Sequence, residues 1–358
     1  MRVLVTGAEG FLGRHLQLRL HATTDHEVVP VGRDNWPALA QLVSTADAVV
    51  HIAGVNRGEA AQVEAGNVQL AQDLADAIGA AGRSVRVVYA NSSQAGNSTP
   101  YGKGKLRAAE ILDAADGVDL VDVVLPNLFG EHGRPQYNSF VATFAHGVVT
   151  GADLSVQDRE VELLHVQAAA QVLIDALSGT ESSIRPHGAP TSVAHVLETL
   201  QDQWKVYQSG ELPQLPDRLH VDLFNTLRAV DVAGHTPIPL TLRTDPRGGL
   251  VETVRAHGSE GQTFLSTTVP GITRGQHFHL RKFERFVVIK GQARISLRQV
   301  LTDEVMNFDV TGDSPVAIDM PTGWAHNITN TGDQELLTMF WANELFNPED
   351  PDTYPEEV

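Results

Sequence analysis

Residues 1–13 read MRVLVTGAEGFLG, an apolar run followed by three evenly spaced glycines. The apolar run through Val5 predicts a β-strand, and the glycines predict a tight turn that leads into a helix. Glycines in such a turn let the backbone approach a pyrophosphate, whose negative charge is favoured at the N-terminus of a helix. The stretch therefore predicts a dinucleotide-binding turn built from Gly7, Gly10, Phe11, Leu12 and Gly13.

Strand-like and helix-like segments alternate from this turn to about residue 180. The predicted strands are Arg2–Val5, Val28–Val31, Ala48–Ile52, Val85–Tyr89 and Leu120–Leu125. The predicted helices between them are Gly10–His21, Asn67–Gly79 and Tyr101–Ala115. This alternation is typical of a doubly wound, Rossmann-like α/β fold with parallel strands and crossover helices.

The pattern changes beyond Leu240. Short runs rich in Val, Ile, Thr and Phe recur there between turns that contain glycine and proline, which is typical of an antiparallel β-barrel or sandwich. We therefore predict an α/β domain over residues 1–238 and an all-β domain over residues 239–358. Residues 347–358 are acidic and rich in proline, and we expect this tail to be loose or to pack on a partner subunit.

The composition excludes several classes of function. The chain has 358 residues, a formal net charge of −18 and no cysteine. Nucleic-acid binding needs a basic surface, so the charge argues against it. The lack of cysteine excludes disulfides, cysteine-ligated zinc and thiol nucleophiles. No apolar run approaches the roughly 20 residues of a membrane span, and the chain opens on a strand, so we expect a cytoplasmic protein without a signal peptide or membrane anchor.

Two further strand ends contribute to the predicted dinucleotide site. The second strand leads into VGRD at residues 31–34, where an acid would bond a ribose hydroxyl and an arginine would pair with a 2′-phosphate. We favour Arg33, and therefore NADP(H) as the cofactor. The third strand ends in Ala53 and Gly54, whose small size would allow the cofactor to approach closely. His51 in the same strand is expected to be a packed, structural residue.

A tyrosine and a lysine lie four residues apart at a predicted helix start, in YGKGK at residues 101–105. Residues i and i+4 share a helix face, so the ammonium of Lys105 favours the phenolate of Tyr101 and lowers its pKa. Tyr101 can then pass a proton at neutral pH, while a hydroxyl of Ser92 or Ser93 at the preceding strand end holds a substrate carbonyl. Together with the glycine turn, this arrangement predicts a site for carbonyl reduction.

These motifs resemble those of the extended short-chain dehydrogenase/reductase family, which handles nucleotide sugars. The matching segments are Thr6–Gly13, Asp47–Gly54, Asn67-Val68, Ser92-Ser93, Tyr101–Lys105 and residues 126–130. The resemblance implies a catalytic triad of Ser93, Tyr101 and Lys105, with Ser92 as the alternative serine and Lys105 also in contact with the cofactor. Seven residues separate Ser93 from Tyr101, whereas many extended members have a longer insert, so this loop is shortened.

A second group of polar residues lies in the C-terminal half. It reads G-x5-H-x-H-x4-E-x6-G over residues 271–291 and P-x-G-x2-H-x3-N over residues 321–330. The two histidines of H-x-H alternate on a predicted strand, so both rings face one side, and the carboxylate and third histidine can converge on them from neighbouring strands. Three imidazoles and a carboxylate suit zinc or another divalent transition metal. The predicted metal ligands are His277, His279, Glu284 and His326.

In this order and spacing, the two patterns resemble the two motifs of the cupin superfamily. The full chain resembles a family of bifunctional enzymes of capsular-polysaccharide synthesis, in which a reductase precedes a cupin. Leu280 and Phe283 depart from that family, where these positions look more polar. The segments that carry the resemblance are Ala46–Asn56, Pro100–Leu106, Thr244–Gly248 with Glu252, and Trp341–Pro348.

The resemblance implies a two-step reaction on a UDP-linked 2-acetamido-2,6-dideoxy-4-keto-hexose. The cupin would epimerise C3, whose proton is acidic only while C4 is a ketone, and a metal or oriented donors would stabilise the enolate oxygen. The reductase would then reduce C4 with NADPH to a 6-deoxy-talosamine-type nucleotide sugar. A homodimer is expected, since relatives of both halves commonly pair.

Three alternatives remain open from the sequence. The cupin domain can be a purely structural dimerisation module beside an active NADPH-dependent reductase. The chain can be an NAD-dependent sugar epimerase or dehydratase, which would retain its cofactor and consume no NADPH. It can also be a non-enzymatic sensor of sugar nucleotides, although a sensor has no need of an intact triad. Arg134 and Lys282 are the favoured basic residues for the substrate diphosphate.

Overall fold

The computed structural model of the chain describes residues 1–246, 248–258 and 260–358. One residue of the segment 244–248, Arg247, lies outside the described residues. Within the described part, no helix combines the length and the apolar character that a membrane crossing requires.

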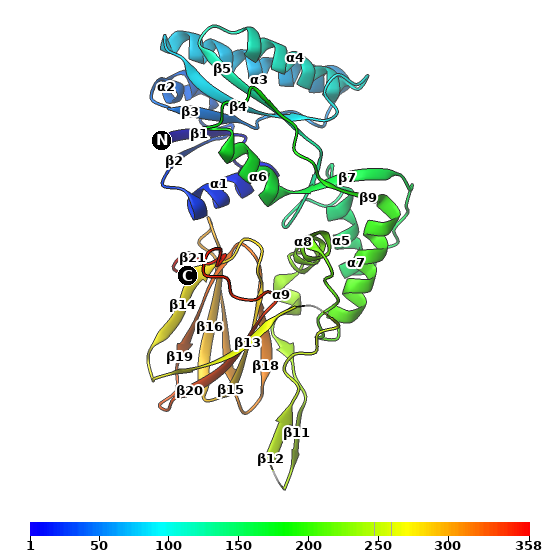
Figure 1. Cartoon of the computed structure of the whole chain (residues 1–358), viewed down its shortest axis with the longest axis vertical. Coiled ribbons are helices and arrows are strands. Elements are labelled where there is room, and N and C mark those ends of the chain that lie inside the picture. The colour runs from blue at the N-terminus through cyan, green and yellow to red at the C-terminus, as the bar shows by residue number, and fades with distance from the viewer. Residues whose placement is uncertain (247, 259) are drawn as a thin grey trace. The chain divides into compact units, whose positions relative to one another are not determined.

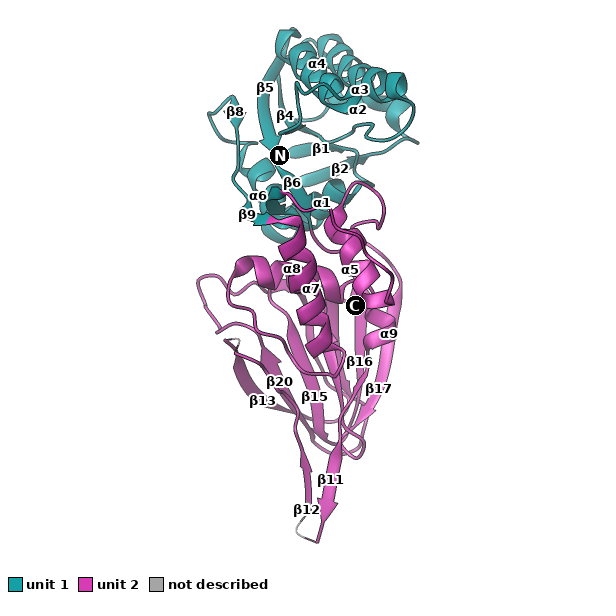
Figure 2. Cartoon of the chain, turned by 90° about the vertical axis from the view of Figure 1, so that its right-hand side faces the viewer, with its two compact units in different colours: residues 1–129, 160–191 teal, residues 130–159, 192–358 magenta. Residues whose placement is uncertain are grey.

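The chain folds into two compact units, which Figure 2 colours separately. Unit 1 comprises residues 1–129 and 160–191, and unit 2 comprises residues 130–159 and 192–358. The predicted domain boundary between residues 238 and 239 falls inside unit 2 and stays a prediction.

Unit 1 is built on a six-stranded sheet with the order β2-β1-β3-β4-β5-β8 (Figure 1). Neighbouring strands pair in parallel, so the predicted Rossmann-like α/β sheet is confirmed. Its strands are nearly continuous apolar runs, because both faces of the sheet are covered. The strands are β1 (Arg2–Thr6), β2 (Glu27–Val31), β3 (Ala48–His51), β4 (Val85–Ser92), β5 (Val118–Leu125) and β8 (Ser183–Ile184).

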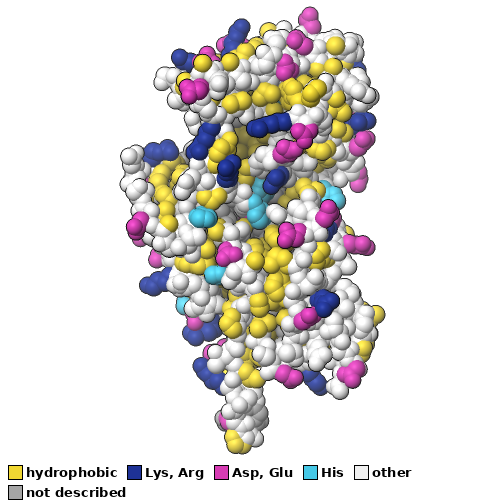
Figure 3. Space-filling model, turned by 180° about the vertical axis from the view of Figure 1, so that it is seen from behind, with side chains coloured by type: hydrophobic (Ala, Val, Ile, Leu, Met, Phe, Trp, Pro, Cys, Tyr) yellow, Lys and Arg dark blue, Asp and Glu magenta, His cyan; other side chains and the backbone are white. Residues whose placement is uncertain are grey.

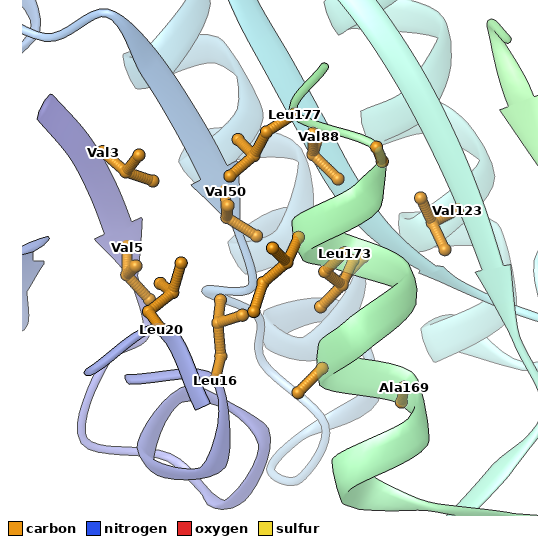
Figure 4. Close-up of a cluster of buried hydrophobic side chains, with 14 of the residues drawn as sticks. Val3, Val5, Leu16, Leu20, Val50, Val88, Val123, Ala169, Leu173 and Leu177 are labelled. Carbon is orange, nitrogen blue, oxygen red and sulfur yellow. The ribbon is translucent and has the colours of Figure 1, made fainter. Parts of the chain in front are cut away.

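One face of this sheet packs against α1 (Phe11–Thr23) and α6 (Val166–Asp175). Val3 points to this face, because alternate residues of a strand point to opposite sides. It belongs to a fully buried cluster with Leu16 of α1 and Leu173 of α6, which Figure 4 shows. This core fixes the position of α1, and therefore of the glycine turn that precedes it.

The opposite face packs against α3 (Ala60–Ala81) and α4 (Pro100–Ala114). Leu4 points to this side and shares a buried cluster with Leu74 of α3 and Leu112 of α4. The cluster thereby fixes α4, the helix that carries the predicted tyrosine and lysine. The remaining elements of this part are η1 (Trp36–Ala38), α2 (Leu39–Ser44) and a small sheet of β6 (Asn127–Phe129), β7 (Glu160–His165) and β9 (Ala189–Ser192).

Unit 2 contains two five-stranded antiparallel sheets, which confirms the predicted all-β character of the C-terminal half. Phe286, Ile318 and Phe340 of the first sheet share one buried core with Ile295 and Ile328 of the second. The first sheet has the order β10 (Ile238–Pro239), β18 (Val316–Met320), β15 (Glu284–Lys290), β20 (Leu336–Ala342) and β13 (Gln262–Thr268). The second has the order β17 (Val305–Thr311), β16 (Gln292–Gln299), β19 (Trp324–Asn330), β14 (Thr273–Phe278) and β21 (Tyr354–Pro355).

Helices and a hairpin complete unit 2. The side chains of Ser192 and Asp217 cap α7 and α8 by accepting a backbone N–H three residues on, which explains why these helices begin there. The elements are α5 (Phe140–Thr150), α7 (Val193–Tyr207), α8 (Arg218–Arg228), α9 (Val232–His235) and the hairpin of β11 (Leu242–Asp245) and β12 (Gly248–Val251).

A buried ion pair joins α7 to the first sheet of unit 2. Arg285 of β15 and Asp319 of β18 form a bidentate pair with N–O distances of 2.6 and 2.9 Å. The hydroxyl of Tyr207, the last residue of α7, donates to the same carboxylate at 3.0 Å, and Arg285 donates to the carbonyl of Gly210 at 2.7 Å. Because every charge of the pair is hydrogen-bonded, its burial is tolerated and α7 is held in one position.

The C-terminal tail packs on its own chain, so the expectation that it is loose is wrong, while packing on a partner subunit stays a prediction. Tyr354 pairs with Phe278 of β14, and the N–H of Glu356 donates to the carbonyl of Gln276 at 2.9 Å. The carboxylate of Glu356 also accepts from Arg298 at 2.5 Å. The acidic tail is therefore held by a basic residue, Arg298, and by the edge of β14 in the same chain.

Candidate functional site

The glycine turn joins β1 to α1 at the carboxyl edge of the parallel sheet. Gly7 has a φ of 70°, and a Cβ there would lie 2.8 Å from the backbone nitrogen of Ala53 at the end of β3. A Cβ on Gly13 would lie 2.8 Å from the Cα of Ala8 and closer still to the carbonyl oxygen of Gly7. The hydroxyl of Thr6 accepts hydrogen bonds from the N–H groups of residues 52 and 53, both at 3.2 Å. The turn is closed against β3, and glycine is required at both positions.

The N-terminus of α1 is a suitable place for a phosphate. Gly10 is its N-cap, and no side chain of the described residues caps this helix of 13 residues. Phe11 and Leu12 form its half-buried first turn. Gly54 lies at the β3 side of the turn, where a Cβ would come within 3.0 Å of the amide oxygen of Asn67. A backbone cradle of this kind, with the unpaired N–H groups of a helix start, fits the pyrophosphate of a dinucleotide.

Arg33 lies two residues beyond β2 and is exposed. An acid is close to it, because a Cβ on Gly32 would lie 2.9 Å from the carboxylate of Glu9 in the glycine turn. The predicted 2′-phosphate ligand is therefore at the surface beside an anion. The sequence itself shows one acid beside Arg33, which is Asp34. The fold brings a second carboxylate, that of Glu9, to the same strand end.

The structure brings the side chain of Ser92 close enough to Tyr101 to lower the pKa of the phenol. Ser92 is the last residue of β4, whereas Ser93 is exposed in the following turn, where its N–H donates to the carbonyl of Leu125 at 2.8 Å. Thr99 caps α4 by accepting from the N–H of residue 102 at 3.0 Å, which sets the start of the helix one residue before Tyr101. The structure thus brings the alternative serine, Ser92, to the tyrosine and leaves Ser93 outside the pair.

Lys105 lies on α4, four residues after Tyr101, and is buried. Its Nζ donates to the carbonyl of Ala90 at 2.7 Å and lies 4.1 Å from the centre of the Tyr89 ring. Burial lowers the pKa of Lys105 to about 7, although Asp122 acts in the opposite direction. Burial raises the pKa of Tyr101 and the side chain of Ser92 acts against this rise, so the expectation that Lys105 lowers this pKa is wrong. Tyr101 is therefore protonated at neutral pH, as a proton donor must be.

His51 is a packed residue, as expected from the sequence. It is buried, shares a hydrogen bond of 2.8 Å with the hydroxyl of Thr6, and stacks on Tyr89 with ring centres 5.6 Å apart. Burial, and to a lesser extent the charge of Lys105, lowers the pKa of His51 to about 3. The ring is neutral, and its hydrogen bond supports the strand end beside the glycine turn.

In unit 2, the predicted metal ligands converge. Ligand atoms of His277, His279, Glu284 and His326 all lie within 4.8 Å of one another. His277 and His326 are cross-strand partners on β14 and β19, and His279 follows the end of β14. Glu284 begins β15, which belongs to the other sheet, so the ligands come from both sheets rather than from neighbouring strands of one.

The chemistry of this cluster fits a divalent cation. The Nε2 atoms of His279 and His326 are buried without a hydrogen-bond partner among the described residues, and they lie 3.4 and 3.6 Å from Oε2 of Glu284. Burial, reinforced by the two other histidines, lowers the pKa of His277 to about 3. Burial also disfavours the charge of Glu284, but His279 and His326 hold the pKa of its carboxyl well below its usual range. Three imidazoles around a carboxylate are a ligand set that suits zinc.

The two positions that depart from the family pattern are packing residues. Leu280 and Phe283 are buried. The Phe283 ring packs 5.5 Å from that of Phe224 on α8 and 5.6 Å from that of Trp341, and the guanidinium of Arg228 lies 4.1 Å from its centre. Their apolar character therefore belongs to the interface between α8 and the first sheet.

Lys282 is not available for a diphosphate, so its predicted role is wrong. It is buried, and its Nζ donates to the carbonyl of Pro351 at 3.1 Å and to the hydroxyl of Thr353 at 3.2 Å. Arg134 lies with its guanidinium 5.2 Å from the centre of the Tyr137 ring. Sequence reasoning missed the tail as the partner of Lys282, since its acidic composition alone does not indicate which basic residue it meets.

Comparison with known proteins shows which family the chain belongs to. The family model described as "NAD dependent epimerase/dehydratase family" matches residues 3–187, more than half of the chain. The chain belongs to this family. A second model, described as "Polysaccharide biosynthesis C-terminal domain", matches residues 243–354. A member of the epimerase/dehydratase family thus carries a C-terminal domain of a kind found in polysaccharide biosynthesis.

Full-length relatives confirm the resemblance predicted from the sequence. The chain is 33% identical to the UDP-2-acetamido-2,6-beta-L-arabino-hexul-4-ose reductase of Pseudomonas aeruginosa, over 99% of this chain and 98% of that protein. The crystal structure of the capsular polysaccharide assembling protein CapF from Staphylococcus aureus covers 100% of both chains, with a TM-score of 0.63 and 32% identity. The spore coat polysaccharide biosynthesis protein SpsL of Bacillus subtilis is 25% identical over 32% of this chain and 81% of that protein.

Proposed function

We propose that this protein is an NADPH-dependent nucleotide-sugar 4-ketoreductase that also epimerises C3 of its substrate. The substrate would be a UDP-linked 2-acetamido-2,6-dideoxy-4-keto-hexose, and the product a 6-deoxy-talosamine-type nucleotide sugar for a surface polysaccharide. The observation that carries the proposal is that β4 and α4 bring Ser92, Tyr101 and a buried Lys105 together in the unit that holds the glycine turn, in one chain with a His/Glu cluster. The activity for which the full-length Pseudomonas aeruginosa relative is named supports the substrate class.

The reduction step would use the residues of unit 1. When bound, the nicotinamide supplies the hydride for C4. Tyr101 donates the proton to the developing C4 alkoxide, and the hydroxyl of Ser92 holds the carbonyl oxygen in reach. Ser93, the serine implied by the family pattern, remains the alternative that mutation must test. Lys105, once charged beside the phenolate that forms, stabilises the anion and contacts the cofactor.

The epimerisation step would use the cluster in unit 2. The C3 proton is acidic only while C4 is a ketone, so epimerisation must precede reduction. A divalent ion held by His277, His279, Glu284 and His326, which we propose to be zinc, would supply Lewis-acid stabilisation of the enolate oxygen. The two buried Nε2 atoms that lack a hydrogen bond within the described residues support this assignment.

We propose NADP(H) rather than NAD(H), with Arg33 as the ligand of the 2′-phosphate. The exposed guanidinium can move onto a phosphate, and a bidentate contact would supply the preference. Glu9 lies at the same strand end and acts against it. Arg33→Ala should lower the affinity for NADPH and leave that for NADH unchanged. An equal loss of affinity for NADPH and NADH would contradict the proposal that Arg33 binds the 2′-phosphate.

The test follows NADPH absorbance and deuterium incorporation at C3 in deuterated water, with the UDP-linked 4-keto substrate. Wild type should consume NADPH and carry deuterium at C3. Tyr101→Phe should keep only the exchange, and His326→Ala should lose it. The matched controls, Tyr137→Phe and His146→Ala, change exposed residues outside both sites and should behave as wild type.

Each alternative predicts a different result of the same experiment. NADPH consumption without C3 exchange would make the C-terminal domain a structural dimerisation module. A tightly retained cofactor with no net NADPH consumption would indicate an NAD-dependent epimerase or dehydratase. Binding of the nucleotide sugar without any turnover would indicate a sensor.

We also propose a homodimer, for which the β11–β12 hairpin is the supporting feature. Its Leu250 side chain is 59% exposed, and hydrophobic side chains are visible on the hairpin in Figure 3. Leu250→Asp should lower the mass measured by light scattering during size exclusion. Leu106→Asp, at a leucine of α4 that is 44% exposed, serves as the control. A wild-type monomer would contradict the proposal.

A further inference from the structure

Asp352 in the C-terminal tail is an acid in an unusual place. It is 2% exposed and has a φ of 44°, in the left-handed region. Its carboxylate accepts hydrogen bonds from three successive N–H groups, those of Leu280 at 3.1 Å, Arg281 at 3.0 Å and Lys282 at 2.7 Å. These residues form the loop that leads from the predicted ligand His279 to the next ligand. One side chain of the tail therefore fixes the backbone between two ligands.

The backbone carbonyl of Asp352 also contacts a ligand directly. Nδ1 of His279 lies 2.6 Å from this oxygen. Because a carbonyl oxygen only accepts, Nδ1 carries a proton, which leaves Nε2 as the ring atom that can face a metal ion. That Nε2 lies 3.4 Å from Oε2 of Glu284. His326 is held in the same way, with Nδ1 3.2 Å from the carbonyl oxygen of Trp324.

Contacts on both sides of Asp352 hold the tail in place. Before it, Asp350 pairs with Arg281 at 2.8 Å. Beyond it, β21 adds to the edge of β14, and the N–H of Val358 donates to the side chain of Gln276 at 3.0 Å. The tail thus lies along β14, which carries His277 and ends just before His279. These contacts hold in place the segment from which Asp352 contacts His279.

We infer that Asp352 is a positioning residue of the metal centre, and that the C-terminal tail completes this centre from within the same chain. The inference rests on the proposed metal site. Outer hydrogen-bond partners of this kind set the tautomer and orientation of a ligating histidine, and their loss typically costs about 10- to 100-fold in metal affinity. We therefore expect a loss in that range when the carboxylate is removed.

The test uses the full-length protein and two substitutions that suit a positive φ. Asp352→Gly removes the carboxylate and keeps the left-handed backbone and its carbonyl. Asp352→Asn keeps one acceptor oxygen and should recover part of the affinity. The control Asp350→Gly removes a neighbouring contact of the tail, the ion pair with Arg281, and keeps the Asp352 carboxylate, so it separates the role of that carboxylate from the attachment of the tail. Zn²⁺ affinity is measured by competition with a chromophoric chelator, and ligand geometry by the visible spectrum of the Co²⁺-loaded protein.

Asp352→Gly should weaken Zn²⁺ binding and change the Co²⁺ spectrum, with Asp352→Asn intermediate and Asp350→Gly unchanged. A general loss of stability would lower the melting temperature without altering the Co²⁺ spectrum. If Asp352→Gly does not fold, Asp352→Asn decides. Wild-type Zn²⁺ affinity and a wild-type Co²⁺ spectrum in the Asp352 variants would overturn the inference, and so would an equal loss of affinity in Asp350→Gly. Neither result would contradict the proposed metal site. A wild-type protein that binds no Zn²⁺ would overturn the metal site itself.

Discussion

Replacing Gly13 with alanine tests the dinucleotide turn directly. The new Cβ would lie 2.8 Å from the Cα of Ala8, where ordinary contact begins at 3.4 Å, so the two must separate by at least 0.6 Å (3.4 minus 2.8). Both neighbours that it meets are backbone, at Ala8 and at the carbonyl of Gly7, so no flexible side chain can move aside. The turn must therefore open, and its N–H groups move off the pyrophosphate.

The size of the effect follows from the hydrogen bonds that the shift disturbs. A hydrogen bond to a charged group contributes about 1.5–3 kcal/mol, so losing one should weaken NADPH binding about 10- to 100-fold. Isothermal titration of NADPH into Gly13→Ala gives this affinity, and Zn²⁺ binding by the same variant should be unchanged. Gly79→Ala is the matched control, because a Cβ there meets nothing within 4 Å. That control should bind NADPH normally and gain up to about 1 kcal/mol in stability. Normal NADPH binding by Gly13→Ala would refute the assignment of the turn.

Three further predictions concern other parts of the structure. Folding lowers the pKa of Lys105 from 10.5 to about 7, so between these values the unfolded chain binds the extra proton and stability rises with pH. Lys105→Met should therefore raise the melting temperature more at about pH 6 than at about pH 9. An equal change at both pH values would contradict the conclusion that burial lowers the pKa of Lys105. Asp319→Ala should cost about 3–5 kcal/mol in urea unfolding, because it leaves Arg285 buried and unpaired, and a cost under about 1 kcal/mol would show that the pair is hydrated. Ser92→Ala should lower kcat far more than Ser93→Ala, and the reverse order would restore the serine that the family pattern implies.

Local patterns account for the parts of the fold that the sequence predicts well. Strands of the parallel sheet are covered on both faces, so they read as apolar runs such as residues 2–5 and 120–125. The glycine turn is also local, since Gly7 and Gly13 are required by backbone contacts within and beside the turn. The cluster of three histidines and a glutamate was predictable because three of its four residues lie within eight positions, from His277 to Glu284.

What escaped prediction depends on where elements end and on distant contacts. β4 continues to Ser92, three residues beyond the predicted end at Tyr89, and this extension decides which serine meets Tyr101. The side chain of Asp352 meets a backbone 72 residues away, at Leu280. No local pattern indicates that pairing, because it depends on the tail finding the open edge of β14.

The division of the chain into interleaved segments has a consequence for the order of synthesis. Unit 1 needs residues 160–191, so it is complete only when residue 191 has left the ribosome. By then α5 has already emerged, but α7 and α8, against which it packs, have not. Domains generally fold as units, beginning at the N-terminus. Unit 1 can therefore fold before α7 and α8 are available to cover the apolar face of α5. At that stage the nascent chain carries α5 as a helix whose apolar face is not yet buried.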